Sequence, residues 1–281
     1  FRTSDNKIAY TKFDGTNWSA PVYIETNNAG ICYWPDIDVD VNGYAHITYT
    51  DTQGENGAYT DQPDIMYAEN ITNGDGTFKK VVIYNGYVNN MGGSDWSRCF
   101  YNKGSRIAVD EIGNYYIMAH EHIHNTYGYQ DRYYGVVVTT STSSGGTAQT
   151  QVDNYDIYDI VGYGGSVYAL YKDDDVIRTG SIALDGTITS QPYDALNNQA
   201  INPHGLSPRL EVAGLYGTNL FVKYNDAGIG YEEAYSDITV KQNTRVAVVN
   251  KGNEFSVAYI LYTDDADSNI KVMTVPTRPP S

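Results

Sequence analysis

The sequence has few cysteines, few positive charges and no long apolar run. Its 281 residues include two cysteines, Cys32 and Cys99, which excludes a disulfide-dense scaffold. No apolar run reaches the roughly 18 residues that a membrane-spanning helix needs, so we expect no membrane insertion. Eighteen Lys and Arg stand against 34 Asp and Glu, which gives a net charge of −16. This acidic balance argues against nucleic acid as a partner.

The long Leu, Ala, Glu and Lys patterns of amphipathic helices are also missing. The chain is instead rich in Tyr (28) and Gly (27), with Tyr, Val, Ile and Thr runs broken by Asn-Gly, Asp-Gly and Gly-Gly. Such runs are typical of β-strands joined by tight turns. The length suits one large all-β domain, and we predict a single domain over residues 1–281. Because the chain starts at Phe1, we expect a mature or excised domain.

A two-strand unit recurs along the chain. Aligning Ile37–Asp51 with Ile107–Asn125 superposes an alternating strand, a Gly turn and a second strand. Four of five such second strands end in Tyr-x-Asp, at Tyr49-Thr50-Asp51, Tyr171-Lys172-Asp173, Tyr224-Asn225-Asp226 and Tyr262-Thr263-Asp264. The remaining one reads Ala119-His120-Glu121. The repeat indicates the fold, and the exception points to a functional site.

A second motif recurs in phase with the first. The turn between the third and fourth strand of each unit reads Asp-Gly-Thr or Gly-Gly-Thr, at 14–16, 75–77, 145–147 and 185–187. Gly there supplies a positive φ, and the Asp carboxylate can cap the turn. Four-stranded antiparallel units repeated about five times predict a β-propeller. We expect five blades, with six as the alternative and a surplus strand near Ile8 or Ile270.

One turn carries a family resemblance. Asp14-Gly15-Thr16-Asn17-Trp18 resembles the Asp-box, the Ser-x-Asp-x-Gly-x-Thr-Trp turn of sialidase-like (BNR-repeat) propellers. In that family the box also lies between the third and fourth strands of a blade. The resemblance implies a secreted or cell-surface, glycan-related propeller. It does not extend to catalysis, since no arginine triad and no nucleophilic Tyr-Glu pair can be recognised.

The longest loops of the expected ligand face, at 52–62, 85–105 and 125–132, belong to the first two full units. Ligand sites gather where loops are long on a rigid scaffold. The candidate ligand-contacting residues there, with one from a later unit, are Tyr33, Trp34, Trp96, Arg98, Tyr101, Arg106, Tyr127, Tyr129, Arg132 and His204. Tryptophan and tyrosine rings stack on the apolar face of a pyranose. Arginine pairs with a uronate carboxylate in a bidentate manner. Channel plugging and surface ion pairing remain the alternatives for these side chains.

Three of the five histidines alternate along one strand, at His120, His122 and His124. Alternation presents all three on one face. They could supply two ligands to a divalent metal, act in acid–base chemistry, or form a hydrogen-bonded strand end. The acidic stretches Asp173–Asp175 and Asp264–Asp267 are further candidates for weak cation binding.

Three functions are compatible with these residues, and the sequence leaves open whether the protein is an enzyme. The first is glycan or polysaccharide recognition through Trp34, Trp96 and nearby tyrosines. The second is a polysaccharide lyase, with Arg98 or Arg106 neutralising a uronate, His120 or His122 as base and Tyr127 as acid. The third is a structural or assembly role at a cell surface, with self-association by strand addition.

The two cysteines precede first strands of neighbouring units. Cys32 and Cys99 lie in connections on the same predicted face, and no other cysteine competes for pairing. We therefore predict a Cys32–Cys99 disulfide, which an extracellular setting would permit.

Overall fold

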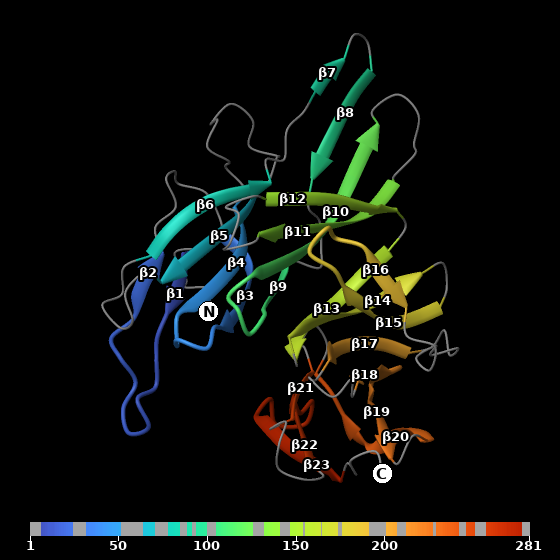
Figure 1. Cartoon of the computed structure of the whole chain (residues 1–281). Helices are drawn as coiled ribbons and strands as arrows, with labels where there is room; N and C mark the ends of the chain where they lie inside the picture. Colours follow the sequence, from blue (N-terminus) through green and yellow to red (C-terminus); the bar gives the residue numbers. More distant parts are fainter. Residues whose placement is uncertain are drawn as a thin grey trace. The chain divides into compact units, whose positions relative to one another are not determined.

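The computed structural model describes residues 7–24, 32–51, 64–70, 78–84, 89–91, 94–99, 105–125, 132–140, 147–153, 155–163, 165–173, 176–190, 201–206, 212–226, 229–241, 246–250 and 257–276. Throughout these ranges every regular element is a β-strand, and every pairing is antiparallel. In the same ranges no helix is long and apolar enough to cross a membrane. The predicted all-β class is confirmed (Figure 1).

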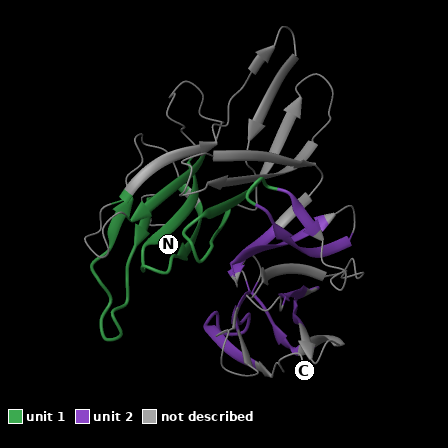
Figure 2. Cartoon of the chain, viewed as in Figure 1, with its two compact units in different colours: residues 1–156, 184–186 green, residues 157–183, 187–281 purple. Residues whose placement is uncertain are grey.

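The contacts divide the chain into two compact units (Figure 2). The first comprises residues 1–156 and 184–186, and the second comprises residues 157–183 and 187–281. Each unit is built from sheets whose strands largely follow one another along the chain.

The first unit contains a hairpin, a four-stranded sheet and a six-stranded sheet. The hairpin consists of β1 (Ile8–Tyr10) and β2 (Val22–Ile24). The four-stranded sheet has the order β3 (Cys32–Val39), β4 (Ala45–Asp51), β5 (Asp64–Asn70) and β6 (Phe78–Tyr84). The strands of the six-stranded sheet are β7 (Asn89–Met91), β8 (Ser94–Cys99), β9 (Arg106–Val109), β10 (Tyr115–Asn125), β11 (Arg132–Thr140) and β12 (Thr147–Asp153).

Strand β10 has two partners along a single edge. Its residues 115–118 pair with β9, and its residues 122–125 pair with β8. Because β10 is much longer than β9, its far half would otherwise leave backbone N–H and C=O groups without ladder partners. The sequence predicted one long connection over 85–105, so this β7–β8 hairpin is a correction. The sheet has six strands where four were expected.

The second unit contains two four-stranded sheets and a three-stranded sheet. The first has the order β13 (Tyr155–Tyr163), β14 (Ser166–Asp173), β15 (Val176–Ile182) and β16 (Ile188–Ser190). The second has the order β17 (Ile201–Leu206), β18 (Val212–Tyr216), β19 (Asn219–Asp226) and β20 (Ile229–Thr239). The third has the order β21 (Ala247–Asn250), β22 (Val257–Thr263) and β23 (Ile270–Pro276).

The fourth repeat departs from the predicted strand plan. The sequence predicts its four strands at 208–213, 220–224, 230–235 and 238–242. The expected third and fourth strands form the single strand β20, whose register slips between Asn219 and Leu220 of β19. The preceding segment, expected to be a connection, supplies β17 instead. A bulge therefore takes the place of the predicted turn, and an upstream strand makes up the number of four.

Hydrophobic clusters lie between the strands of each unit. In the first, Ile8 and Ile24 of the hairpin pack with Cys32, Ile47 and Tyr49 of the adjoining sheet. A second cluster there joins Ile65, Tyr67, Ile107, Ile117 and Ala119 from the two larger sheets. The second unit has corresponding clusters around Leu170 and Leu220. Ile8 lies in the two-stranded hairpin and Ile270 in the three-stranded sheet, so both lie outside the four-stranded sheets.

Candidate functional site

Trp34, a predicted ligand-contacting residue, lies in a β-bulge. The register of β3 with β4 shifts between Tyr33 and Asp36, and Trp34 has a φ of 47°. A bulky residue in the left-handed region is an outlier that its surroundings must hold in place. The side chain is 37% exposed at the start of β3. The bulge therefore presents an indole ring at the end of the sheet where the predicted site lies.

The end of β4 beside this bulge is polar and buried. Thr50 lies opposite Tyr33, and Asp51 lies opposite Cys32. The hydroxyls of Tyr49 and Thr50 are buried and have no hydrogen-bond partner among the described residues, and Asp51 is 5% exposed. Burial, with Cys32 and Asp51 nearby, raises the pKa of Tyr49 above its ordinary value, so this hydroxyl stays protonated.

Arg106 lies at the first position of β9 and is 7% exposed. Its Nη1 donates a hydrogen bond of 2.7 Å to the carbonyl of Ser105. The Ser105 hydroxyl in turn lies 2.7 Å from that of Thr48 on β4. Arg106 was predicted to contact a uronate, and its burial favours a role in holding the two sheets together.

The repeated Tyr-x-Asp strand ends place tyrosine rings in the core. Tyr49, Tyr171 and Tyr262 are at most 8% exposed. Aligning the repeats places Ala119 at the corresponding position of β10, and Ala119 is also buried, at 5%. A methyl group therefore takes the place of a phenol ring in the one repeat that continues into His120.

The structure brings several predicted site residues together on three neighbouring strands. His122 of β10 lies opposite Cys99 of β8 on one side and Tyr133 of β11 on the other. His124 lies opposite Ser97, and His120 lies opposite Gly135. The three histidines therefore occupy successive alternate positions of the central strand in this part of the sheet.

Two predicted arginines lie on the same three strands, at positions offset by one residue from the histidine positions. Ile123 of β10 lies between Arg98 of β8 and Arg132 of β11, and Asn125 lies opposite Trp96. Successive positions of a strand belong to opposite faces of its sheet. The histidine positions therefore belong to one face, and the positions of Trp96, Arg98 and Arg132 belong to the other.

Four further predicted site residues lie in another sheet or outside the described residues. Tyr101, Tyr127 and Tyr129 lie outside the described residues. His204 lies in the second unit, at the bulge of β17 where the register with β18 slips between Pro203 and Gly205. The part of the chain that the structure describes contains no disulfide, and Cys32 is buried. The side chain of Cys99 lies outside the described side chains, so the pairing stays a prediction.

Among the described side chains no cluster of three metal-ligating groups is found. The predicted weak cation site at 264–267 already holds a cation of the protein itself. Lys271 Nζ lies 3.0 Å from Asp264 Oδ2 and 3.2 Å from Asp267 Oδ2. This ammonium group keeps the pKa of Asp264 below its ordinary value. The side chains of His120, His122 and His124 are not among the described side chains, so their metal-binding role stays a prediction.

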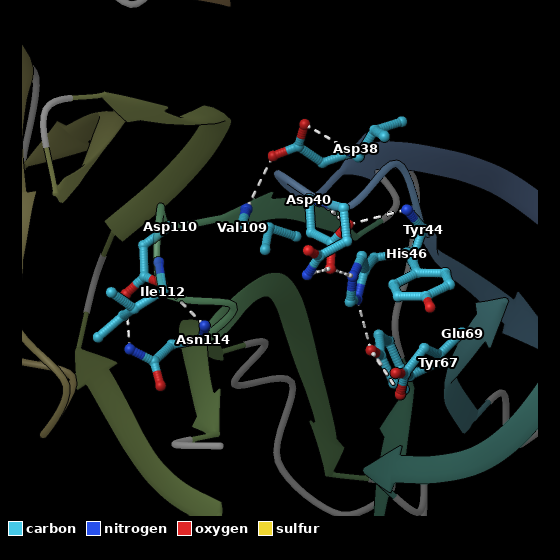
Figure 3. Close-up of polar contacts among 12 residues, drawn as sticks. Asp38, Asp40, Tyr44, His46, Tyr67, Glu69, Val109, Asp110, Ile112 and Asn114 are labelled. Carbon is cyan, nitrogen blue, oxygen red and sulfur yellow. Dashed lines mark hydrogen bonds and ion pairs between the residues drawn. The ribbon is translucent and has the colours of Figure 1, made fainter. Parts of the chain in front are cut away.

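Sequence reasoning missed the carboxylates that join the first two large sheets. Asp36 Oδ2 accepts a hydrogen bond of 3.0 Å from the backbone N–H of Ile107. Asp38 Oδ2 accepts one of 2.7 Å from the backbone N–H of Val109 (Figure 3). Both donors belong to β9, on the edge that faces away from β10. Side-chain oxygens thus take the place of a neighbouring strand.

A buried polar chain lies at the opposite end of β4 from Asp51. The Tyr67 hydroxyl donates to Glu69 Oε2 at 3.4 Å and lies 2.7 Å from His46 Nδ1 (Figure 3). This direction requires the proton of neutral His46 to be on Nδ1. Nε2 then faces Asp40 Oδ2 at 3.8 Å. Tyr67 also stacks on Tyr115, with ring centroids 4.1 Å apart.

His46, Tyr67 and two carboxylates are also groups used in acid–base catalysis. However, these hydrogen-bonded side chains are buried, so a substrate cannot reach them. His46 is 4% exposed and Tyr67 is 2% exposed. Burial and Glu69 raise the pKa of Tyr67, so its hydroxyl remains a donor. We therefore assign these hydrogen-bonded side chains a structural role at the junction of the two sheets. The available sequence signal was His46 itself, one of five histidines in the chain.

No protein-family model and no curated protein sequence matches this chain. Its fold is similar to that of solved carbohydrate-active proteins. One is a mutant of the NanB sialidase from Streptococcus pneumoniae, at 7% identity and a TM-score of 0.53, over 89% of this chain and 61% of that chain. Another is an ulvan lyase from a new family of polysaccharide lyases, at 10% identity and a TM-score of 0.55, over 95% of this chain and 68% of that chain. The same lyase bound to -[GlcA(1-4)Rha3S]- gives a TM-score of 0.52 at 10% identity, over the same shares of both chains. These neighbours have β-propeller-like folds, and the all-β fold of this chain is similar to theirs.

Proposed function

We propose that the protein is an extracellular, glycan-recognising β-propeller with one specialised site at the His120 end of β10. The observation that carries this proposal is the replacement of a core tyrosine by Ala119 in the sheet that continues into three histidine positions. Repeats that serve the fold alone keep the tyrosine. The proposed propeller has five blades, or six if the β1–β2 hairpin belongs to a further one.

The strained Trp34 supports the same location. An exposed indole held in a left-handed conformation is a costly arrangement, of about 1–3 kcal/mol, and such strain clusters at ligand-binding positions. Its first-unit neighbours at the end of β4 include the buried, unpartnered hydroxyls of Tyr49 and Thr50. An apolar ring beside hydrogen-bonding groups matches the two kinds of surface that a pyranose offers.

A second candidate function is cleavage of a uronate-containing polysaccharide by β-elimination. It is favoured by the register, which sets a histidine position, His122, directly opposite a tyrosine position, Tyr133. In such a reaction a base removes the proton next to the uronate carboxyl group, and an acid protonates the leaving oxygen. An arginine would neutralise the carboxylate. The positions of Arg98 and Arg132 belong to the other face, so this arginine would have to come from elsewhere.

The test is a binding and turnover assay with the His120→Ala/His122→Ala variant. The probes are ulvan, polygalacturonate, a sialylated glycan and neutral dextran, with calorimetry for binding and the absorbance of unsaturated uronate for cleavage. The variant should lose binding to the glycan that the wild type recognises, while its melting temperature barely changes. The Tyr23→Ala variant, which removes an exposed ring from the β1–β2 hairpin, is the control and should bind normally. Full binding by the double variant would contradict the proposed site.

The assay also separates the alternatives. A lower melting temperature in a strong chelator would show a bound metal. An unchanged melting temperature would exclude metal binding by the histidines. Binding without release of unsaturated product would reject the lyase. A wild-type protein that ignores all four probes but self-associates in sedimentation would favour the structural or assembly role.

A further inference from the structure

Two aromatic rings lie side by side on the surface of the β1–β2 hairpin. Phe13 is 49% exposed and Trp18 is 68% exposed. Their ring centroids are 5.3 Å apart and their planes are tilted by 41°, so the rings form a shallow corner. The two residues also form a cross-strand bridge. They are separate from the site described above, which is built from β3, β4 and β8–β11.

The turn between the two rings is firmly held. Asp14 Oδ1 accepts hydrogen bonds of 2.8 Å and 2.7 Å from the backbone N–H groups of Thr16 and Asn17. These bonds lower the pKa of Asp14 and keep its carboxylate turned towards the backbone. Gly15 supplies the required positive φ of 100°. The loop tip thus has a defined shape before any ligand arrives.

The strands below the turn are linked in the same way. Ser19 N–H donates to the carbonyl of Lys12 at 2.8 Å, and Lys12 N–H donates to Ser19 Oγ at 3.0 Å. Thr11 Oγ1 donates to the carbonyl of Ser19 at 2.9 Å. The rings are therefore held by a rigid hairpin, which lowers the entropic cost of binding.

The charge of this hairpin is opposite to that of the whole chain. Residues 7–24 contain Lys7, Lys12 and Asp14 as their charged groups, so their net charge is 2 − 1 = +1, against −16 for the protein. The carboxylate of Asp14 is also engaged by backbone N–H groups. An anionic ligand would meet less repulsion here than over the average surface.

We propose that Phe13 and Trp18 form a second, stacking subsite for an anionic polysaccharide. The subsite rests on the proposed glycan function and extends it to a substrate class, a uronate-containing polymer long enough to contact two places on one protein. Pyranose rings pack their apolar faces on the indole and phenyl rings, while the positive hairpin favours the carboxylates. The subsite raises the affinity for long chains through multivalency.

The test compares Trp18→Ala and Phe13→Ala with Tyr23→Ala. Tyr23 is 52% exposed on the same hairpin, so its variant is a control for loss of an exposed aromatic ring. All three substitutions leave the core intact, and the variants should fold like the wild type. The probes are long polygalacturonate and ulvan, short oligosaccharides prepared from each, and neutral dextran, measured by calorimetry at low ionic strength.

Trp18→Ala and Phe13→Ala should each weaken binding of the long anionic probe by about tenfold, with short oligosaccharides unaffected. Tyr23→Ala should bind both as the wild type does. Adding Trp18→Ala to the His120→Ala/His122→Ala background should abolish any binding of the long probe that the double variant retains.

Four results would overturn the subsite. Unchanged binding of long probes in both variants rejects it and leaves the proposed function standing. Equal loss in the Tyr23→Ala variant shows that the effect is not specific to the pair. A wild-type dimer that becomes a monomer on Trp18→Ala would make the surface a self-association interface. Failure of the wild type to bind any probe would reject the proposed function as well.

Discussion

Asp38 on β3 accepts a hydrogen bond of 2.7 Å from the backbone N–H of Val109 on β9, 71 residues further along the chain. Asp36 makes the corresponding bond with Ile107, so two carboxylates bind alternate amides of one strand edge. The two largest sheets of the first unit are thereby joined through side chains. This junction carries Arg106 and the strand that leads into the candidate site.

The Asp38→Asn variant should change the pH dependence of stability. Burial raises the pKa of Asp38, and hydrogen bonds from Val109 and Val39 oppose this effect. Because the folded pKa lies above the unfolded value, wild-type stability falls as pH rises from about 3.9 through the folded pKa. Asparagine keeps an acceptor oxygen for Val109 and has no proton to lose. Urea unfolding from pH 4 to 8 should therefore show that the stability of the variant increases relative to that of the wild type as pH rises.

Asp264→Asn is the control of opposite sign. Lys271 lowers the pKa of Asp264, so wild-type stability from this group is present above the unfolded pKa and is lost as pH falls. The free energy of unfolding of the variant should therefore be closest to that of the wild type at low pH. Parallel curves for the Asp38→Asn variant and the wild type would contradict the role given to burial.

Tyr67→Phe should destabilise the first unit without affecting glycan binding. The change leaves the stack on Tyr115 but removes the hydroxyl that lies 2.7 Å from His46 Nδ1. An unsatisfied polar group in a buried site costs about 1–3 kcal/mol. Tyr44→Phe is the matched control, since the hydrogen bond drawn for Tyr44 in Figure 3 comes from its backbone N–H. Equal stability of the two variants in denaturant titrations would show that the polar chain is unimportant.

Tyr171→Ala should be among the most damaging substitutions in the second unit. Tyr171 is 1% exposed at the end of β14, and truncating a buried aromatic ring costs about 3–5 kcal/mol. The exposed Tyr23→Ala should stay within about 0.5 kcal/mol of the wild type. Thermal unfolding measures both. A mild effect at Tyr171 would mean that the repeated Tyr-x-Asp ends are not core elements.

Gly180→Ala should destabilise the sheet of β13 to β16. A Cβ atom there would lie 2.9 Å from the backbone oxygen of Thr189 and 2.9 Å from Cγ2 of Ile188. Overpacking of this kind costs about 1–3 kcal/mol. Gly217→Asn is the contrast, because its φ of 64° suits asparagine and the space around it is open. If Gly180→Ala melts like the wild type, the strand β16 can move aside.

Thiol titration decides the Cys32–Cys99 pairing. Unfolded protein that has not been reduced should show no reactive thiol if the disulfide exists, and the Cys32→Ser variant should then show one. Cys32 is buried in the hydrophobic cluster that contains Ile8 and Ile24 of the hairpin, so the wild type must be unfolded before its thiol can react. Two reactive thiols in the unfolded wild type would refute the bond.

Local signals in the sequence were enough to predict the paired hairpin turns. Asp40 and Asp110 were aligned from their spacing to Gly43 and Gly113, and the structure gives both turns the same form. In each, the Asp Oδ1 accepts from the residues two and four positions on, and the glycine has a φ above 80°. These features depend on a few neighbouring residues, so pattern reasoning reaches them.

Features that depend on distant residues escaped prediction. Strands β7, β8 and β17 were predicted to be connections. They form on the free edge of a sheet made elsewhere in the chain, and local patterns do not reveal such an edge. The carboxylates of Asp36 and Asp38 were missed for the same reason, because their acceptor role depends on β9. The candidate site was similarly half-predicted. The histidines were found, whereas the one-residue offset of Arg98 and Arg132 follows from a register that no local pattern specifies.

The succession of neighbouring strands within each sheet has a kinetic consequence. Pairings such as β14 with β15 and β22 with β23 close short loops, and short loops form quickly and at low entropic cost. The bonds from Asp36 and Asp38 to β9 span 71 residues and have to wait until both sheets exist. Weakening these bonds should therefore speed unfolding far more than it slows folding. The persistence of the native state would then depend on the contacts between sheets.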